Sequence, residues 1–476
     1  MASRLETIYQ WLPAGAQNAA LSVYGLHLLR TRYSGNYPRY LDEAIRRGHL
    51  SAESLSEYVD SCLQDVLRAA VSNVPYYRDR HREGGFPVES VRGVGNLCQL
   101  PMLEKNVVRD NPERLVSDRY RLRGLEVIHT TGTSGTPLKI FCNPNVRQRN
   151  YAFHDRFLAT SGIDRRGLRA TIGGRIILPA SVDRGPYWRQ SYFQRNLLFS
   201  SYHLAPHTIE QYIGKLKESK PAHIDAYPSS VYAIADYARD SRISLMGITG
   251  AIVTSGETLF EEQRSLIEEQ FGVRVFDQYG CAEMSVLVTS CTHGAYHAST
   301  DFGVLEILRE DGTAAGPGEE GEIVCTGLIN DVMPLIRYRI GDRAVADDRT
   351  CSCGSPFPTV RSVLGRMDDV IVTPEGNRVG RLSPVLKGFP VKEAQYRQDS
   401  VDEVQVLIVA DNGYDPETEK RLIGQIRLRL GGTMRIRIER VESIDRGKGG
   451  KLKLIVSSLG QSTRSTASNS IEEQRS

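Results

Sequence analysis

Apolar residues change their spacing along the chain, and each spacing predicts a different kind of element. Close to the N-terminus, apolar side chains recur every three or four positions after the run Ser54-Leu55-Ser56-Glu57. That run has the form of a capping box, and the spacing after it predicts an amphipathic helix. Residues 1–120 are therefore expected to be mostly helical.

Strand and helix patterns alternate through residues 121–300. One helix carries Leu266, Ile267 and Phe271 on one side, Gly272 provides a stop signal, and a short strand pattern over 273–276 follows. Alternation of this kind predicts an α/β fold of layered parallel sheets with helices. Ligands of such folds bind at the carboxyl ends of the strands.

The pattern becomes richer in strands over residues 301–365, with turns at Asp311-Gly312 and Gly316-Pro317-Gly318. We expect a small β-barrel-like sheet there, which completes a large N-terminal domain over 1–365. A smaller α+β domain is expected over 366–459, with a strand near 401–409, a helix over 416–430 and a further strand from Met434. Residues 460–476 are rich in Ser, Thr, Gln and charge, which predicts a disordered tail.

Composition narrows the class of partner. The chain has 476 residues, 40% of them hydrophobic, which exceeds the size at which one core stops growing. Its 60 basic and 57 acidic residues give a net charge of +3, too small to favour nucleic acid, so we expect small-molecule partners. Neither a secretion signal nor a run of about 20 apolar residues is found, and we expect a cytoplasmic protein with no transmembrane segment. A homodimer is left open.

A polar loop directly after the apolar pair Val127-Ile128 has the composition of a phosphate site. Glycines let backbone N–H groups approach an anion, and hydroxyls add hydrogen bonds without bulk. Thr136 stands where a Walker A loop would carry lysine, and the alternative is an ordinary polar turn. The loop residues are Thr130, Thr131, Gly132, Thr133, Ser134, Gly135, Thr136 and Pro137.

Four of the cysteine and histidine residues have spacings that suit a metal. Cys351 and Cys353 lie in a tight turn closed by Gly354, and Cys291 precedes His297 by six residues. Together they would form a closed, structural zinc site with three sulfur ligands and one nitrogen. His293 is the rival nitrogen ligand, and the alternative is reduced thiols beside packed loop residues.

Further motifs follow the polar loop in a fixed order. They are Ser255-Gly256-Glu257, Tyr279-Gly280-Cys281-Ala282-Glu283, Tyr338-Arg339-Ile340-Gly341-Asp342, Gly365-Arg366-Met367-Asp368-Asp369 and Gly450-Lys451. This ordered set resembles the adenylate-forming ligase superfamily, in the phenylacetate-CoA ligase branch that includes capsule-associated ligase-like proteins. The resemblance covers nearly the whole chain, from Val74-Pro75-Tyr76-Tyr77 to Lys451.

The resemblance implies a role for each motif. The 131–136 loop would cradle the β- and γ-phosphates of ATP, and the carboxylate of Glu283 would bind Mg²⁺. Asp342 would accept both ribose hydroxyls, and Arg366 would reach ribose or phosphate. The adenine site would be lined by Ser255, Gly256, Glu257, Tyr279 and Gly280, with Tyr279 stacking on the base.

The resemblance further implies a mobile C-terminal lid. Lys451 would span the attacking carboxylate and the α-phosphate, with Lys448 as its competitor in the same basic turn. Asp368 would be the hinge. Tyr227 and His203 are candidates for the acid pocket, although a lone histidine is more often structural.

The chemistry implied is that of an AMP-forming ligase. ATP, Mg²⁺ and a carboxylic acid would give an acyl-adenylate, and the acyl group would pass to a thiol, with coenzyme A as the favoured acceptor. An amine acceptor, for example in capsular polysaccharide biosynthesis, is the second hypothesis. The third is a nucleotide-binding scaffold without catalysis.

Overall fold

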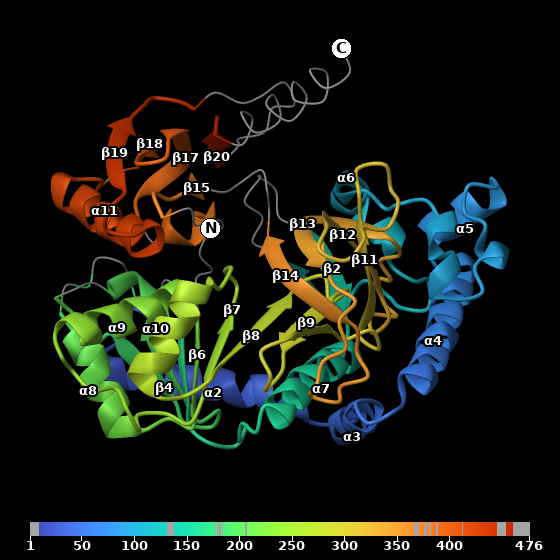
Figure 1. Ribbon diagram of the computed structural model, residues 1–476, viewed down its shortest axis with the longest axis horizontal. Coiled ribbons are helices and arrows are strands. Elements are labelled where there is room, and N and C mark those ends of the chain that lie inside the picture. Colours follow the sequence, from blue (N-terminus) through green and yellow to red (C-terminus); the bar gives the residue numbers. More distant parts are fainter. Residues whose placement is uncertain are drawn as a thin grey trace, which may run out of the picture.

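The computed structural model describes most of the chain. The described residues are 9–130, 138–175, 177–178, 182, 184–204, 207–365, 371–375, 378–379, 382–386, 389–411, 413–444 and 454–459. A large body holds the first part of the chain up to β14, and a smaller unit formed by the C-terminal elements lies above it (Figure 1). Within the described residues, no helix is both long and apolar enough to cross a bilayer.

The N-terminal region is helical, as its pattern predicted. It contains α2 (Ala14–Tyr33), α3 (Tyr37–Arg47), α4 (Ala52–Asn73), α5 (Pro75–Arg82) and α6 (Lys105–Asp110). The buried face of α4 has the predicted helical spacing, with Leu55, Val59 and Leu63 among its buried residues. The cap was predicted one turn too late, because it is the Ser51 side chain that accepts a hydrogen bond, from the Ser54 backbone N–H.

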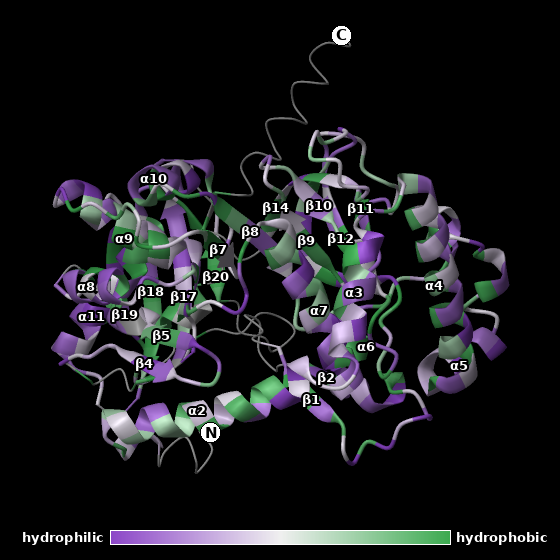
Figure 2. Cartoon of the chain, turned by 90° about the horizontal axis from the view of Figure 1, so that it is seen from below, coloured by the Kyte–Doolittle hydropathy of each residue, from purple (hydrophilic) through white to green (hydrophobic). Residues whose placement is uncertain are grey.

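Five parallel strands form the centre of the body, as the alternation predicted. They are β3 (Arg169–Gly173), β5 (Asn196–Ser200), β6 (His223–Ala226), β7 (Ile252–Ser255) and β8 (Val275–Gly280), with β4 (Trp188–Ser191) antiparallel at the edge. The helices of this part are α7 (Pro144–Thr160), α8 (Ile209–Ser219), α9 (Pro228–Asp240) and α10 (Glu261–Phe271). Apolar residues of strands and helices share one core, and Figure 2 shows them as green segments inside polar ones.

The expected barrel-like sheet is not separate from the parallel strands. Its strands continue the same sheet, which has twelve strands in the order β11-β12-β13-β14-β10-β9-β8-β7-β6-β3-β5-β4 and does not close on itself in the described residues. The added strands are antiparallel: β9 (Leu287–Ser290), β10 (Tyr296–Ala298), β11 (Gly303–Leu308), β12 (Glu320–Gly327), β13 (Tyr338–Ala346) and β14 (Thr359–Gly365). Register shifts along β13 locally increase twist and bend this arm. A hairpin of β1 (Glu126–His129) and β2 (Lys139–Cys142) forms a sheet of its own.

The C-terminal unit has its own core. Its sheet has the order β19-β18-β17-β20, from β17 (Val391–Ser400), β18 (Glu403–Ala410), β19 (Arg435–Arg440) and β20 (Ile455–Ser457). A short hairpin of β15 (Ile371–Val372) and β16 (Arg378–Val379) precedes it. The helix α11 (Pro416–Leu430) has the predicted bounds, because Asp415 caps its start and Gly431 its end.

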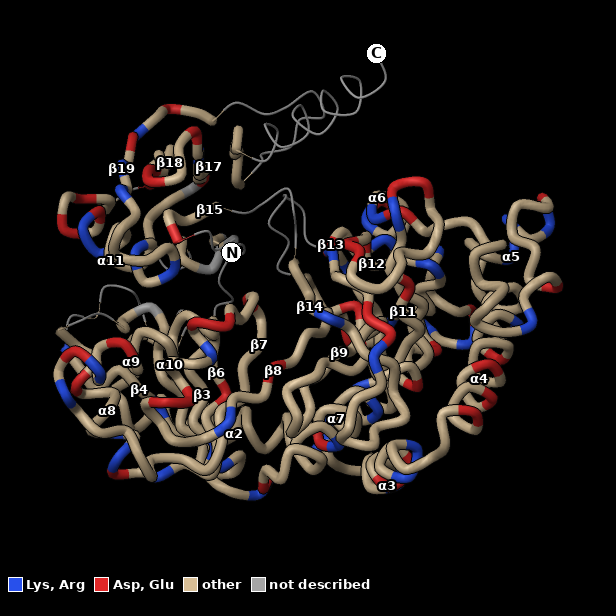
Figure 3. The backbone as a smooth tube through the Cα atoms, viewed as in Figure 1, with Lys and Arg blue, Asp and Glu red and all other residues tan. Residues whose placement is uncertain are grey.

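Charges of both signs are mixed over the tube of Figure 3, in keeping with the small net charge. The C-terminal unit contacts the body through α11, which packs on α9. The Gln425 side-chain amide donates a hydrogen bond to the Leu204 carbonyl oxygen at 3.0 Å. The arrowheads of β7, β8 and β14 point toward the side on which this unit lies (Figure 1).

Candidate active site

A cavity of about 440 Å³ lies at the ends of β7 and β8, against β13 and β14. Three of the motifs predicted to bind nucleotide contribute to its wall: Gly256 and Glu257, then Tyr279 and Gly280, then Asp342. Ser255 and Glu283, from the same motifs, do not line it. The fold thus collects segments that are far apart in the sequence, and the volume falls in the range of small-molecule sites.

Strand pairing explains why the first two segments meet. The strands β7 and β8 are parallel, and Ser255 pairs with Gln278, so the residues that follow both strands leave the sheet side by side. Gly256 has a φ of +84°, in the left-handed region that favours glycine. The turn therefore folds back toward the cavity without strain.

Two tyrosine–carboxylate hydrogen bonds link β13 to the segment 279–283, and each segment provides one tyrosine and one carboxylate. The Tyr279 hydroxyl donates to Asp342 Oδ2 at 2.7 Å, and the Tyr338 hydroxyl donates to Glu283 Oε1 at 3.2 Å. The strand β13 supplies the carboxylate of one pair and the tyrosine of the other. Burial, and then the neighbouring carboxylate, raises the pKa of both tyrosines, so each hydroxyl remains a donor at neutral pH.

Glu283 has the surroundings of a cation ligand. Its side chain is buried, and among the described residues the only hydrogen bond it receives is from Tyr338, at one carboxylate oxygen. The second oxygen is able to accept a hard cation such as Mg²⁺. Glu283 can therefore supply one oxygen ligand of the kind that Mg²⁺ prefers.

Glu257 lies between the body and the C-terminal unit. Its Oε2 accepts a hydrogen bond from the Ser229 backbone N–H at 3.1 Å, and its carboxylate forms an ion pair with Arg429 of α11. The guanidinium of Arg429 also lies over the Tyr227 ring, with its Cζ 5.3 Å from the centroid. Arg429 could not be predicted from the sequence, because arginines alternate with apolar residues at the end of α11 and their spacing is not distinctive.

The two acid-pocket candidates are in different surroundings. His203 is buried, its Nδ1 lies 2.7 Å from the Ser200 hydroxyl, and its ring stacks on Tyr187 at 5.2 Å. These contacts match the structural alternative for a lone histidine. Tyr227 immediately precedes α9, beside the end of β3, where its backbone N–H donates to the Ile172 carbonyl oxygen at 3.1 Å.

Sequence analysis missed several residues of the cavity wall. Arg264 donates to the Tyr296 hydroxyl at 3.2 Å, and that hydroxyl donates to Asp277 at 2.8 Å. Burial raises the pKa of Asp277, while the hydroxyls of Thr254 and Tyr296 oppose the rise. Arg349 and Arg361 also line the wall. None of these belongs to a motif, and only the folded chain brings them together.

The remaining predicted site residues lie outside the described residues. These are Thr131, Gly132, Thr133, Ser134, Gly135 and Thr136 of the polar loop, Arg366, the hinge residue Asp368, and Lys451 with its competitor Lys448. Their described neighbours are placed. Thr130 accepts a hydrogen bond from the Leu138 N–H at the end of the β1–β2 hairpin, and Gly365 lines the cavity.

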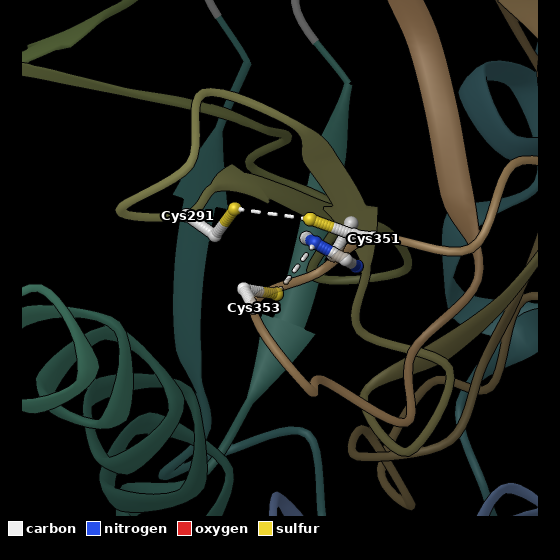
Figure 4. Close-up of side chains that lie close together, drawn as sticks. Cys291, Cys351 and Cys353 are labelled. Atoms are coloured by element: carbon white, nitrogen blue, oxygen red, sulfur yellow. Dashed lines mark hydrogen bonds between the residues drawn. The ribbon is translucent and has the colours of Figure 1, made fainter.

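The four predicted zinc ligands lie together. One ligand atom from each of Cys291, His297, Cys351 and Cys353 lies within 4.8 Å of every other. The Sγ atoms of Cys291 and Cys351 are 3.7 Å apart, and Cys353 Sγ is 3.4 Å from His297 Nε2 (Figure 4). Ligands at tetrahedral angles around zinc are separated by about 3.5 to 3.8 Å. The spacing therefore fits a single zinc ion.

The surroundings of the cluster also suit a metal. His297 Nδ1 lies 2.9 Å from the Phe357 carbonyl oxygen, which places the ring proton there and leaves Nε2 to coordinate. Backbone N–H groups of His293 and Ser355 point at the sulfurs of Cys291 and Cys353. The rival ligand His293 is exposed and is not one of the four.

The cluster adjoins the cavity along the chain. Gly294, Ala295 and Tyr296 lie between its first two ligands, and all three line the cavity. Asp347 and Arg349, just before Cys351, line it as well. A metal at the cluster would therefore tie together two loops that form one wall of the cavity.

Comparison with known proteins places these features in a family. Residues 371–458 match the family model of the CapK C-terminal domain. Protein CapK of Staphylococcus aureus is 25% identical over 461 residues, which cover 96% of this chain and 100% of that protein. The phenylacetate-coenzyme A ligase of Thermus thermophilus is 22% identical, over 86% of this chain and 97% of that one.

Solved structures share the fold. A 2-hydroxyisobutyryl-CoA ligase in complex with 2-HIB-AMP and CoA superposes with a TM-score of 0.60 at 19% identity, covering 88% of this chain and 94% of that one. The mixed sheet and the separate C-terminal unit thus have the fold of that ligase. With the ordered motifs and the relatives above, they show that the chain belongs to the adenylate-forming ligase superfamily, in its phenylacetate-CoA ligase branch.

Proposed function

We propose that the protein is an AMP-forming ligase that activates a carboxylic acid with ATP and passes the acyl group to coenzyme A. One observation carries this proposal: the three nucleotide motifs, separated by up to 86 positions from Gly256 to Asp342, line one cavity. The proposal is supported by the relatives. Several of them are phenylacetate-CoA ligases, and the match to this chain covers most of their length.

The described residues suit the nucleotide by their chemistry. The Asp342 carboxylate can accept two ribose hydroxyls, and its hydrogen bond from Tyr279 fixes its orientation. Tyr279 offers an aromatic ring to adenine. Glu283 would hold Mg²⁺, which neutralises phosphate charge when bound. The 131–136 loop, Arg366 and Lys451 would bind the phosphates and the reacting groups.

The reaction would run in two steps. A carboxylate oxygen of the acid attacks the α-phosphorus, and the bond to pyrophosphate breaks. The thiol sulfur of the acceptor then attacks the acyl carbon, AMP leaves, and the thiol proton passes to solvent. The protein would contribute mainly position and charge, because both steps bring anions together. Asp368 would serve as the hinge between the two steps.

An assay of pyrophosphate exchange into ATP tests the first step with a panel of acids. Exchange that depends on one class of acid is expected. ATP binding without exchange for any acid would favour the scaffold hypothesis instead. Competition between coenzyme A and hydroxylamine for the activated acid then tests the acceptor, and preference for the amine would replace the thioester step by amide formation.

We also infer that Cys291, His297, Cys351 and Cys353 hold a structural zinc ion. All four tetrahedral positions would be filled by protein, so the ion would have no open site for substrate. Its role would be to stabilise the cavity wall.

A further inference from the structure

Three arginines lie near one another: Arg32 on α2, Arg147 on α7 and Arg175 after β3. Arg32 and Arg147 share the ring of Tyr151, with their Cζ atoms 4.4 Å and 5.4 Å from its centroid. Arg175 is near enough to Arg32 to influence it electrostatically. Figure 2 shows why α2 can take part: it runs from the edge strand β4 toward the β1–β2 hairpin.

These positive charges are poorly compensated. Arg32 Nε is buried and has no hydrogen-bond partner among the described residues. Burial lowers the pKa of Arg32, and the charges of Arg147 and Arg175 add to this effect, whereas Tyr151 and Tyr33 oppose it. No carboxylate is among these influences. Among the described residues, the one acidic partner in the cluster is Glu126, which is 3.6 Å from Arg147 and has a side chain that is 49% exposed to water.

The cluster adjoins the predicted acid pocket through the sheet. The strands β3 and β6 are parallel, and Ile172 pairs with Ala226, so the residues after Ile172 pass beside Tyr227. A Cβ atom at Gly174 would overlap the Tyr227 hydroxyl, so a glycine is needed there. Arg175 comes next, at the carboxyl end of β3, where ligands of parallel sheets bind.

We propose that Arg32, Arg147 and Arg175 form an anion site for a phosphate or carboxylate group that one of the two organic substrates carries away from its reacting atom. Guanidinium groups suit both anions, since their planar N–H groups bind oxygen pairs. The packing on Tyr151 holds two side chains in place but cannot neutralise their charge. The site rests on the proposed function only for the identity of its ligand's owner.

The phosphates of ATP are a poor match for this site. Arg147 pairs with Glu126, at the end of the β1–β2 hairpin opposite Thr130, where the predicted phosphate loop begins. Four residues of extended strand separate these ends by about 13 Å. The anion therefore belongs to the acid or to the acceptor. Coenzyme A, the proposed acceptor, carries phosphate groups that could fill the site.

Binding of inorganic phosphate tests the site without any reaction. Calorimetric titration of wild type and Arg32→Gln should show at least a tenfold loss of phosphate affinity in the variant, because a charge-assisted contact is lost. Arg32→Lys should restore part of it. Arg30→Gln is the matched control, since Arg30 is exposed two positions away on the same helix. Should Arg32→Gln fail to fold, Arg175→Gln at an exposed position serves instead. Equal phosphate affinity in the wild type and the folded variant would overturn the proposal.

Paired substrates identify the owner of the anion. In pyrophosphate exchange, 4-carboxyphenylacetate is compared with phenylacetate, and in acyl transfer, coenzyme A is compared with pantetheine, which lacks its phosphates. An Arg32→Gln increase of about tenfold in KM for the first member of either pair alone supports the site and names its source. Equal effects on both members in both pairs would overturn it. If no acid supports exchange, the proposed function fails, while the phosphate titration still decides the site.

Discussion

Single residues in this protein act mostly by fixing one another. The carboxylates of Asp342 and Glu283 each receive a tyrosine hydroxyl from the other segment of the site, Tyr279 and Tyr338. Two of the predicted motifs therefore hold each other in place, because the carboxylate of each is oriented by the tyrosine of the other. Replacement of either tyrosine by phenylalanine removes the hydrogen bond that orients the carboxylate but keeps the carboxylate's charge, so these variants test orientation alone.

Removal of one tyrosine hydroxyl should therefore weaken the binding of only one ligand, either ATP or Mg²⁺. Tyr279→Phe removes the hydrogen bond from Tyr279 to Asp342, and we expect KM for ATP to rise about three- to tenfold, as for loss of one hydrogen bond to a charged group. Tyr338→Phe should instead raise the Mg²⁺ concentration needed for half-maximal exchange. Tyr120→Phe is the control, since its hydroxyl bonds Asp331 away from the cavity. Identical kinetics in all three variants would refute these roles.

His223 makes stability depend on pH. It is buried at the start of β6, and burial lowers its pKa to about 4, with a further contribution from Arg169. Asp225 and Asp164 oppose the shift, and His154 adds to it. The unfolded chain binds the proton more readily, so the stabilisation is complete above the unfolded pKa of about 6.5 and decreases as pH falls toward 4.

Urea unfolding at pH 7 and pH 5 measures this effect. Between these values, the wild type should lose about 2 kcal/mol more unfolding free energy than His223→Gln does. His207→Gln, at an exposed position, should retain the wild-type pH dependence. Parallel pH profiles for His223→Gln and the wild type would contradict the assignment.

At the scale of elements, local sequence signals predicted the bounds of helices well, but they did not predict which distant strands pair. The bounds of α11 follow from Asp415 and Gly431, both visible in the sequence. The prediction of a barrel-like sheet was wrong because no local pattern reveals that β14 pairs with β10, far away in the sequence, and so becomes part of the sheet of the parallel strands. For the same reason, motif spacing predicted the cysteine and histidine cluster, whereas Arg264 and Arg429 became visible only in the fold.

The cluster gives a test at the scale of two loops. Purified protein should contain about one zinc ion per chain, and Cys351→Ser should lose it, with a melting temperature lowered by at least about 2 °C. Cys98→Ser, at an exposed cysteine outside the cluster, should keep both metal and stability. Wild-type protein without metal by mass spectrometry, yet equally stable, would show that the thiols are merely reduced.

For the whole molecule, the contact between α11 and the body decides how the C-terminal unit is held. Arg429 joins Glu257 at the cavity wall and covers the Tyr227 ring, while Gln425 bonds Leu204. Both side chains of the ion pair are about nine-tenths buried. Loss of one partner leaves a buried charge uncompensated, which is costly, so release of the unit is the expected response.

Hydrogen exchange can detect this release. In Arg429→Gln, the peptides that contain Ser229 and the end of α11 should exchange at least about tenfold faster than in wild type. Arg427→Gln, exposed on the same helix, should leave both peptides protected. Unchanged exchange in Arg429→Gln would mean that the ion pair does not hold the unit in place.

The central claim is that the cavity joining Gly256, Tyr279 and Asp342 binds the nucleotide of an acid-activating reaction. Pyrophosphate exchange with an accepted acid, measured for wild type, Asp342→Asn and the remote control Asp331→Asn, tests it most directly. We predict that KM for ATP rises at least about tenfold in Asp342→Asn and stays unchanged in the control. An unchanged KM in Asp342→Asn would contradict the claim, as would the absence of exchange in wild type with every acid.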